Sequence, residues 1–244
     1  MEKVVEDRPN TIAIDGPAAS GKSTVGQRVA NRLGFLYFDT GAMYRALTLL
    51  ALEHGLDLSD GRSLGELAEK TIIEIRPPSG EYKDGRQYTV YVEGRDITWK
   101  IRHHLVDINV SQVAAHPEVR EALIKQQRRV GQRGNVVMVG RDIGTVVMYD
   151  APLKIYLDAS IEERARRRYD ECRGREQDVD YDELLASMRE RDRYDSNRAH
   201  APLRPAADAY LISSNDMSID EVVILVLKLA REVMGPESSE VVAR

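Results

Sequence analysis

Residues 16–23 read Gly16-Pro17-Ala18-Ala19-Ser20-Gly21-Lys22-Ser23 and match the pattern G-x-x-x-x-G-K-[ST] of a phosphate-binding loop. Its two glycines allow backbone conformations that turn the amide hydrogens inward around a polyphosphate. Lys22 adds a positive charge at the β and γ phosphates, and the Ser23 hydroxyl can ligate Mg²⁺. The loop predicts ATP and Mg²⁺ as cofactors, bound by Gly16, Pro17, Ala18, Ala19, Ser20, Gly21, Lys22, Ser23 and Thr24.

The segments around this loop have the composition of an α/β protein. A β-branched strand is expected at 11–15 directly before the loop, and a helix with apolar residues at helical spacing follows at 22–33. Apolar strands and helices then alternate, which is typical of a parallel sheet covered on both faces. The further strands are expected at 35–38, 136–139, 154–157 and 210–212, and the further helices at 42–53, 103–114, 118–130, 161–171, 181–193 and 219–234.

Residues 72–99 interrupt this alternation. Short strands are expected at 72–75, 88–92 and 97–99, separated by Pro77-Pro78-Ser79-Gly80 and by Asp84-Gly85. Turn residues between short strands indicate a small antiparallel sheet. We interpret it as an insertion in the main fold.

Composition excludes several other classes. The chain has 244 residues, a formal net charge of -5 and one cysteine, Cys172. Neither a nucleic-acid partner nor an intramolecular disulfide is expected, and a single cysteine fits a reducing cytosol. The first nine residues are charged and lack the apolar core of a signal peptide, and no apolar run is long enough to span a bilayer. We therefore expect a cytoplasmic protein without a membrane partner, and residues after Gly235 look like a frayed end.

Four further motifs resemble those of bacterial cytidylate kinases, which are P-loop nucleoside monophosphate kinases. They span about residues 11–234 and read Asp39-Thr40-Gly41-Ala42-Met43-Tyr44-Arg45, Ser111-Gln112-Val113 with Arg120, Gly140-Arg141-Asp142-Ile143-Gly144-Thr145, and Arg191-Asp192-Arg193-Tyr194-Asp195-Ser196-Asn197-Arg198. The resemblance implies a three-layer α/β fold with a parallel sheet of about five strands, helices on both faces, a small antiparallel-sheet insertion and a helical lid. It also implies a core of residues 1–40, 106–165 and 194–244, an acceptor-binding domain at 41–105 and a lid at 166–193.

The same resemblance implies the site residues. It assigns the acceptor to Thr40, Arg45, Ser111, Arg120, Arg141, Asp142, Asp195 and Arg198, catalysis to Lys22, Arg141, Arg191 and Arg198, and the metal to Ser23. Converging arginines make physical sense, because two anionic substrates must be brought together and the guanidinium fork binds phosphate in bidentate fashion. The alternatives are surface ion pairs for single arginines, and helix caps for Asp39 and Asp142.

A run of arginines marks the expected lid: Arg164, Arg166, Arg167, Arg168, Arg173, Arg175 and Arg191. A closing lid excludes water and delivers arginines to the transferred group. The alternative is a solvated helix with pairs such as Glu163 with Arg167, and we expect most of the run to be of that kind.

The resemblance implies phosphorylation of CMP and dCMP by ATP, in a monomer as in many relatives. Two alternatives stay open: a kinase for UMP or a non-nucleotide acceptor, and a nucleotide-binding switch or regulatory module. The sequence lacks the Asn/Thr-Lys-x-Asp and Asp-x-x-Gly motifs of GTPases, which argues against a switch. No histidine has metal-ligand spacing, so the histidines are taken as structural. Cys172 has no neighbouring histidine base and is assigned no catalysis.

Overall fold

The computed structural model describes residues 9–174, 178–198 and 200–235. Arg175, the first eight residues of the expected core and the tail after Gly235 lie outside the described residues. At the centre is a parallel sheet with the strand order β2-β6-β1-β7-β8, which confirms the predicted α/β class. The strands are β1 (Thr11–Asp15), β2 (Leu36–Asp39), β6 (Val136–Gly140), β7 (Leu153–Asp158) and β8 (Tyr210–Ser213).

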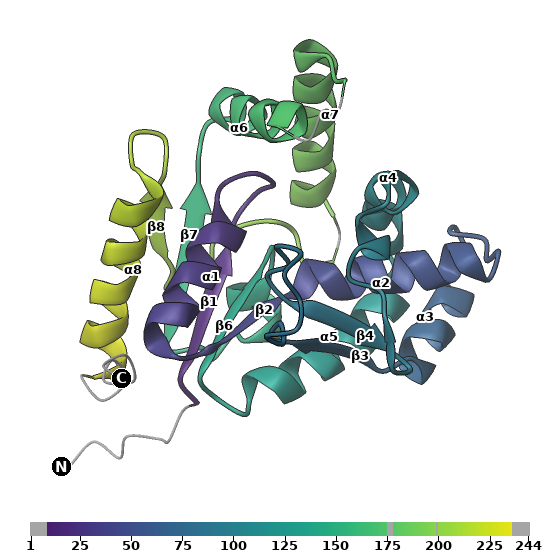
Figure 1. Cartoon of the computed structure of the whole chain (residues 1–244), viewed down its shortest axis with the longest axis horizontal. Helices are drawn as coiled ribbons and strands as arrows, with labels where there is room; N and C mark the ends of the chain where they lie inside the picture. The colour runs from purple at the N-terminus through teal and green to yellow at the C-terminus, as the bar shows by residue number, and fades with distance from the viewer. Residues whose placement is uncertain (1–8, 175–177, 199, 236–244) are drawn as a thin grey trace.

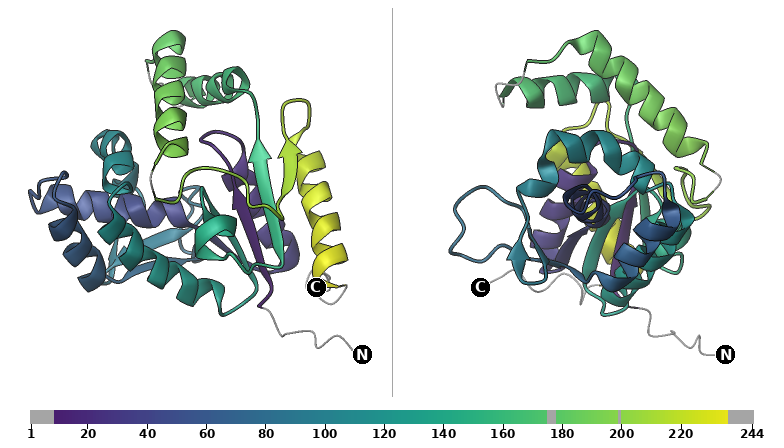
Figure 2. Two further views of the ribbon diagram at one scale, coloured as in Figure 1. Left: turned by 180° about the vertical axis from the view of Figure 1, so that it is seen from behind. Right: turned by 90° about the vertical axis from the view of Figure 1, so that its right-hand side faces the viewer.

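Helices cover both faces of this sheet (Figures 1 and 2). On one face, α1 (Lys22–Leu33) packs against β6 and against α8 (Ile219–Met234). On the other face lie α2 (Thr40–Glu53) and α5 (Pro117–Gly131), which also contact each other. The central strands β1 and β6 are almost wholly buried, because both of their faces are covered and most of their residues are apolar.

The insertion forms a second sheet of three antiparallel strands, as predicted. Its strands are β3 (Ile73–Arg76), β4 (Thr89–Val92) and β5 (Arg95–Asp96). The expectation of a strand at 97–99 is wrong. The Thr98 hydroxyl accepts a hydrogen bond from Val90 N and donates one to Asp96. Val90 N therefore bonds to a side chain instead of to the backbone of a neighbouring strand, and the strand ends before residue 97.

Along the chain, one helix precedes this small sheet and another follows it. One of them, α3 (Gly61–Lys70), is not predicted from the sequence; Asp60 caps it, and it packs on α5. Its glycines at 61 and 65 weaken the helical signal, but Gly65 is needed because a Cβ there would lie 2.6 Å from Glu118 Cβ. The other helix is α4 (His104–Val113), where His103 serves as the cap.

Two further helices stand beyond the carboxyl edge of the main sheet (Figure 1). They are α6 (Ile161–Gly174) and α7 (Tyr181–Ser196), and they pack on each other. Both are longer than expected, and the extra turn of α7 keeps Asp195 within the helix. Two short helical turns complete the described chain, η1 (Lys100–Arg102) and η2 (Ile143–Val147). None of the helices in the described ranges is long and apolar enough to cross a membrane.

Candidate active site

The phosphate loop lies at the carboxyl end of β1 and leads directly into α1. Gly16 has a φ of 150°, and a Cβ there would lie 2.0 Å from the carbonyl oxygen of Leu157, so only glycine fits against β7. Gly21 adopts the left-handed conformation at the N-cap of α1, with a φ of 95°. The positive end of the α1 dipole therefore points at the loop, as an anion site requires.

Lys22 turns back into its own loop. Its ammonium group donates to the carbonyl oxygen of Pro17 and lies 3.5 Å from Ser20 Oγ. Burial, with the positive charge of Arg141 nearby, lowers the pKa of Lys22 to about 7. The negative charge of an anion bound in the loop would raise the pKa of Lys22 again and favour the charged ammonium group. Without a ligand, the loop therefore has too little negative charge to keep Lys22 fully protonated.

Arginines gather beside Lys22. Arg141 follows β6, Arg45 lies on α2 and Arg191 on α7. The positive charge of Arg141, then burial, lower the pKa of Arg191 to about 10; Arg45 also lowers it, whereas Asp195 and Asp107 act in the opposite direction. Such mutual repulsion is unfavourable unless an anion occupies the space between the cations, so this cluster is the strongest sign of a phosphate site.

Two aspartates partly neutralise these arginines. Asp107 on α4 accepts from Arg45 at 2.5 Å and lies 3.8 Å from Arg168 of α6. Burial would raise the pKa of Asp107, but Arg45, Arg168 and Arg191 lower it overall. The carboxylate therefore stays ionised next to the position where the acceptor phosphate is expected.

Asp195 of α7 is the second counterion, and it is 1% exposed. Arg141 Nε lies 2.9 Å from Asp195 Oδ2 in an ion pair without hydrogen-bond alignment, and Arg198 Nη1 lies 3.8 Å from Asp195 Oδ1. Arg198 also donates to the Ala201 carbonyl, while its Nε is buried without a partner among the described residues. A buried hydrogen-bond donor without an acceptor, such as this Nε, favours the binding of a ligand that can accept its hydrogen bond.

Arg120 and Asp142 form a buried ion pair at the other end of the arginine cluster. Arg120 Nη2 donates to Asp142 Oδ2, Nη1 donates to the Ala114 carbonyl at 3.4 Å, and the guanidinium lies 5.7 Å from the Tyr44 ring. Burial raises the pKa of Asp142, although Arg120, Arg198 and Arg141 oppose this shift. The side chain of Asp142 does not cap the helical turn after it, so the cap alternative is wrong.

The remaining expected acceptor residues have different surroundings. The Thr40 hydroxyl is buried and donates to the Val139 carbonyl at 2.9 Å, so its hydrogen bond stabilises the fold and is not available to donate to a substrate. Ser111 is half-buried on α4, one turn after Asp107. Asp39 caps α2 by accepting from Gly41 N, as one of the two alternatives predicted.

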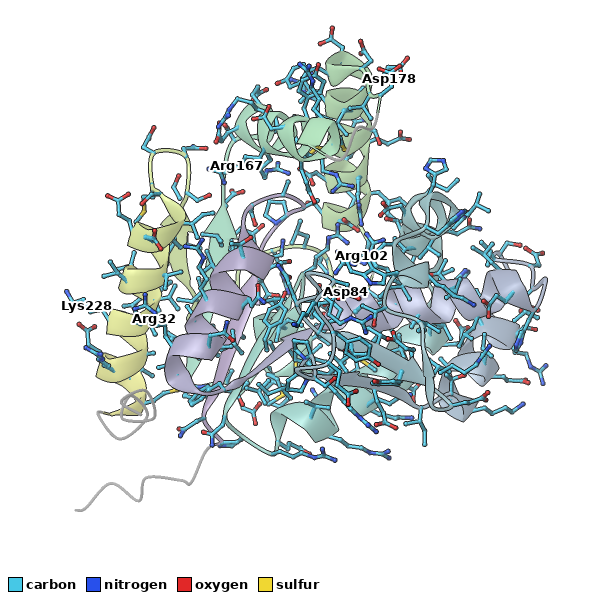
Figure 3. All side chains as sticks on the ribbon, viewed as in Figure 1. Arg32, Asp84, Arg102, Arg167, Asp178 and Lys228 are labelled. Atoms are coloured by element: carbon cyan, nitrogen blue, oxygen red, sulfur yellow. The ribbon has the colours of Figure 1, made fainter. Side chains whose placement is uncertain are left out.

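Most arginines of α6 engage protein partners. Arg166 pairs with Glu163 and Asp170 on its own helix, and the expected pair between Glu163 and Arg167 is present at 2.8 Å. Arg167 also donates to Ser214, directly after β8, so it connects α6 to the end of the main sheet, and Figure 3 labels it. Arg164 is buried and joins the Ala18 carbonyl of the phosphate loop to Asp192 of α7.

One important residue had no signal in the sequence beyond its place before the loop. Asp15 ends β1, is buried, and accepts hydrogen bonds from the backbone of Ile143 and Gly144 at 2.7 Å each. Burial raises the pKa of Asp15 to about 7, with those two hydrogen bonds opposing the shift. Asp15 thereby joins the phosphate loop to the segment that carries Arg141 and Asp142.

The described residues hold no group of three or more His, Cys, Asp or Glu side chains that could bind a metal ion alone. Ser23 is an exposed residue in the first turn of α1, directly after Lys22. A divalent ion held there would need most of its ligands from water and from a bound polyphosphate, which is how Mg²⁺ commonly binds with nucleotides. Ser23 fits that arrangement.

Comparison with known proteins gives one family. The family model described as Cytidylate kinase matches residues 12–232. The curated cytidylate kinase of Herpetosiphon aurantiacus is 51% identical over 221 residues, covering 91% of this chain and 94% of that protein. The cytidylate kinase of Chloroflexus aggregans is 52% identical over 219 residues, with coverage of 90% and 93%, and that of Bacillus pumilus is 47% identical over 223 residues, with coverage of 91% and 96%.

Proposed function

The chain belongs to the cytidylate kinase family, and from this we propose that it transfers the γ-phosphoryl group of ATP to CMP or dCMP, giving ADP and CDP or dCDP. The observation that carries the proposal is the meeting of Lys22, Arg45, Arg141 and Arg191 beside the phosphate loop. A polyphosphate donor and a monophosphate acceptor together supply the negative charge that this cluster lacks.

In the proposed reaction, an oxygen of the acceptor phosphate attacks the γ phosphorus of ATP in line with the bond to the β-phosphate oxygen. That bond breaks, and its electron pair stays on ADP. Lys22 and the loop amides stabilise the leaving side, while Arg45, Arg141, Arg191 and Arg198 hold the acceptor phosphate and the transferred group. No carboxylate has to act as a base, since positioning and charge supply most of the catalysis.

Mg²⁺ belongs to the same proposal. Ser23 would be its protein ligand, together with donor phosphate oxygens and water. When bound, the ion neutralises charge on the β and γ phosphates during transfer. We further propose that the acceptor's base lies against Arg120 and Asp142, with Ser111 and Thr40 nearby, and that Asp195 holds its sugar.

We also propose a division of labour along the chain. Residues 1–40, 106–165 and 194–244 would form the core, 41–105 the acceptor-binding domain and 166–193 the lid. The protein would act as a cytoplasmic monomer without nucleic-acid or membrane partners, in keeping with its charge and single cysteine.

A steady-state assay with ATP and each nucleoside monophosphate tests the proposal directly. Turnover with CMP and dCMP well above that with other acceptors is the expected result. Preferred phosphorylation of UMP or of a non-nucleotide would favour the alternative kinase. ATP binding without transfer to any acceptor would favour a switch or regulatory module.

Replacing Arg45 or Arg141 with Met should weaken CMP binding by roughly 1.5–3 kcal/mol, because each substitution keeps much of the side-chain stem but removes a charged hydrogen-bonding fork. ATP affinity should change much less. Calorimetry of both ligands provides the measurement. Arg32→Met, at an exposed position of α1 away from the cluster (Figure 3), is the matched control and should change neither affinity. Loss of ATP binding instead would assign these arginines to the donor.

The described parts of the proposed lid, residues 166–174 and 178–193, should exchange amide hydrogens faster in the free protein than with both substrates bound. Their only buried side chains are Cys172 and Met188, so little apolar contact holds them closed. Hydrogen exchange monitored by mass spectrometry measures the difference, with α8 as an internal reference. Equal protection in the free and doubly liganded protein would contradict a lid.

A further inference from the structure

The hydroxyl of Tyr88 connects the inserted sheet to the proposed acceptor site. Tyr88 directly precedes β4, is 5% exposed, and packs against Tyr37 with ring centroids 6.0 Å apart. Its hydroxyl donates to Asp39 Oδ2 at 3.2 Å. Asp39 lies 49 positions away in sequence, at the end of β2 and on the main sheet. The insertion is therefore more than an appendage of the fold.

Asp39 uses its second oxygen to begin α2. Its Oδ1 accepts from Gly41 N at 2.9 Å and caps the helix whose first two turns carry Thr40 and Arg45. The Tyr88 hydroxyl thus fixes the orientation of the carboxylate that in turn fixes this helix start. Asp39 also acts on Lys22, because its negative charge opposes the lowering of the Lys22 pKa.

The surroundings keep Tyr88 in its donor form. Burial first, and then the carboxylate of Asp39, raise the pKa of Tyr88, whereas Arg102 and Arg45 act in the opposite direction. The phenol therefore keeps its proton at neutral pH, and its O–H group donates a hydrogen bond to the Asp39 carboxylate. The Arg102 guanidinium lies 5.8 Å from the Tyr88 ring and 5.2 Å from the Trp99 ring.

A second set of contacts holds this arrangement from outside. The Trp99 indole donates to Asp84 Oδ2 at 2.8 Å, so the same indole ring that faces Arg102 is also bonded to Asp84. Arg86 pairs with both Asp84 and Asp96, so the turn after β3 and the strand β5 are joined. The inserted sheet is thus stiffened on the side that carries Tyr88.

We infer that Tyr88 is a positioning residue for the acceptor: its hydrogen bond to Asp39 holds the start of α2, and with it Arg45, in the arrangement that binds the acceptor phosphate. The inference rests on the proposed function and assigns a purpose to the insertion. Tyr88 acts through Asp39 and touches no reacting atom.

Tyr88→Phe tests the inference, since it removes one oxygen atom and keeps the ring packing. Tyr82→Phe is the matched control, because the Tyr82 hydroxyl belongs to the same insertion but lies 3.4 Å from the Tyr91 hydroxyl on the exposed side. We expect Tyr88→Phe to raise the KM for CMP about 3- to 10-fold, the effect of one hydrogen bond, with kcat and the KM for ATP within about twofold of wild type. Tyr82→Phe should leave all three constants unchanged.

Calorimetry should give a matching loss of CMP affinity, and amide exchange in the first turn of α2 should rise in Tyr88→Phe alone. The inference would be overturned if the wild type is active and Tyr88→Phe has the same KM for CMP as Tyr82→Phe. A fall in kcat or in melting temperature of Tyr88→Phe, without any change in its KM for CMP, would also overturn it. A wild type that does not phosphorylate CMP would overturn the proposed function and this inference with it.

Discussion

Lys22→Ala should lower kcat for CMP phosphorylation by at least about a hundredfold while leaving the fold intact. Lys22 is the only lysine in the phosphate loop, and negative charge builds up on the leaving β-phosphate side as the bond to the leaving group breaks. In the free protein, burial and Arg141 lower the pKa of Lys22 to about 7. A bound polyphosphate shifts that equilibrium towards the charged form, so full charge is present when transfer occurs.

The measurement is single-turnover and steady-state transfer from ATP to CMP by the purified variant, with circular dichroism and thermal unfolding as checks of the fold. Lys228→Ala is a matched control, because Lys228 is an exposed lysine of α8 whose ammonium group lies 4.0 Å from Glu232 on the same helix (Figure 3). It should retain wild-type turnover. Near-wild-type kcat in folded Lys22→Ala would remove the catalytic role of the loop.

The main sheet could be predicted from sequence because its central strands are rich in buried apolar residues. Such residues are needed where both faces of a strand are covered: β6 is apolar throughout, β1 has Ile12, Ala13 and Ile14 in succession, and β7 has buried apolar residues at every second position. The phosphate loop could also be predicted from the sequence. Gly16 and Gly21 are required there, because other residues adopt the backbone conformations at these positions only at a high energetic cost.

Contacts between distant side chains could not be predicted in this way. Asp15, Tyr88 and Asp107 belong to no local motif, and each becomes important only because the fold brings it to a partner at least 49 positions away. The short element β5 and the glycine-containing helix α3 were missed or misplaced for a related reason. Their local propensity is weak, and tertiary packing decides their structure.

The pairing of Arg120 with Asp142 also changes how base selection should be tested. Removing the Asp142 side chain would leave the Arg120 guanidinium buried without its counterion, and loss of one partner of a buried pair typically costs about 3–5 kcal/mol of stability. Asp142→Ala would then confuse instability with altered specificity. Asp142→Asn also removes the negative charge, but it keeps the shape of the side chain and an acceptor oxygen for Arg120, so it disturbs the fold less and is the better variant.

The wild-type protein should prefer CMP to UMP by roughly a hundredfold or more in kcat/KM, and Asp142→Asn should narrow that ratio by about tenfold. Cytosine offers acceptors at N3 and O2 and a donor at its amine, whereas uracil has a donor at N3 and an acceptor at O4. Arg120 can only donate, and ionised Asp142 can only accept, so uracil would face like groups at both positions.

The expected narrowing of the CMP-to-UMP ratio follows from the hydrogen-bonding groups of an amide, which has both a donor and an acceptor. The side-chain amide introduced by Asp142→Asn could turn its NH₂ group towards uracil O4 or its oxygen towards the cytosine amine, so the substitution should raise relative UMP activity while CMP activity falls. The measurement is kcat/KM for both acceptors in both proteins, with thermal unfolding to show that the contact with Arg120 still supports the fold. A wild-type ratio near one, or a ratio unchanged by Asp142→Asn, would contradict base reading by this pair and leave phosphoryl transfer itself unaffected, because the phosphate arginines act independently of the base.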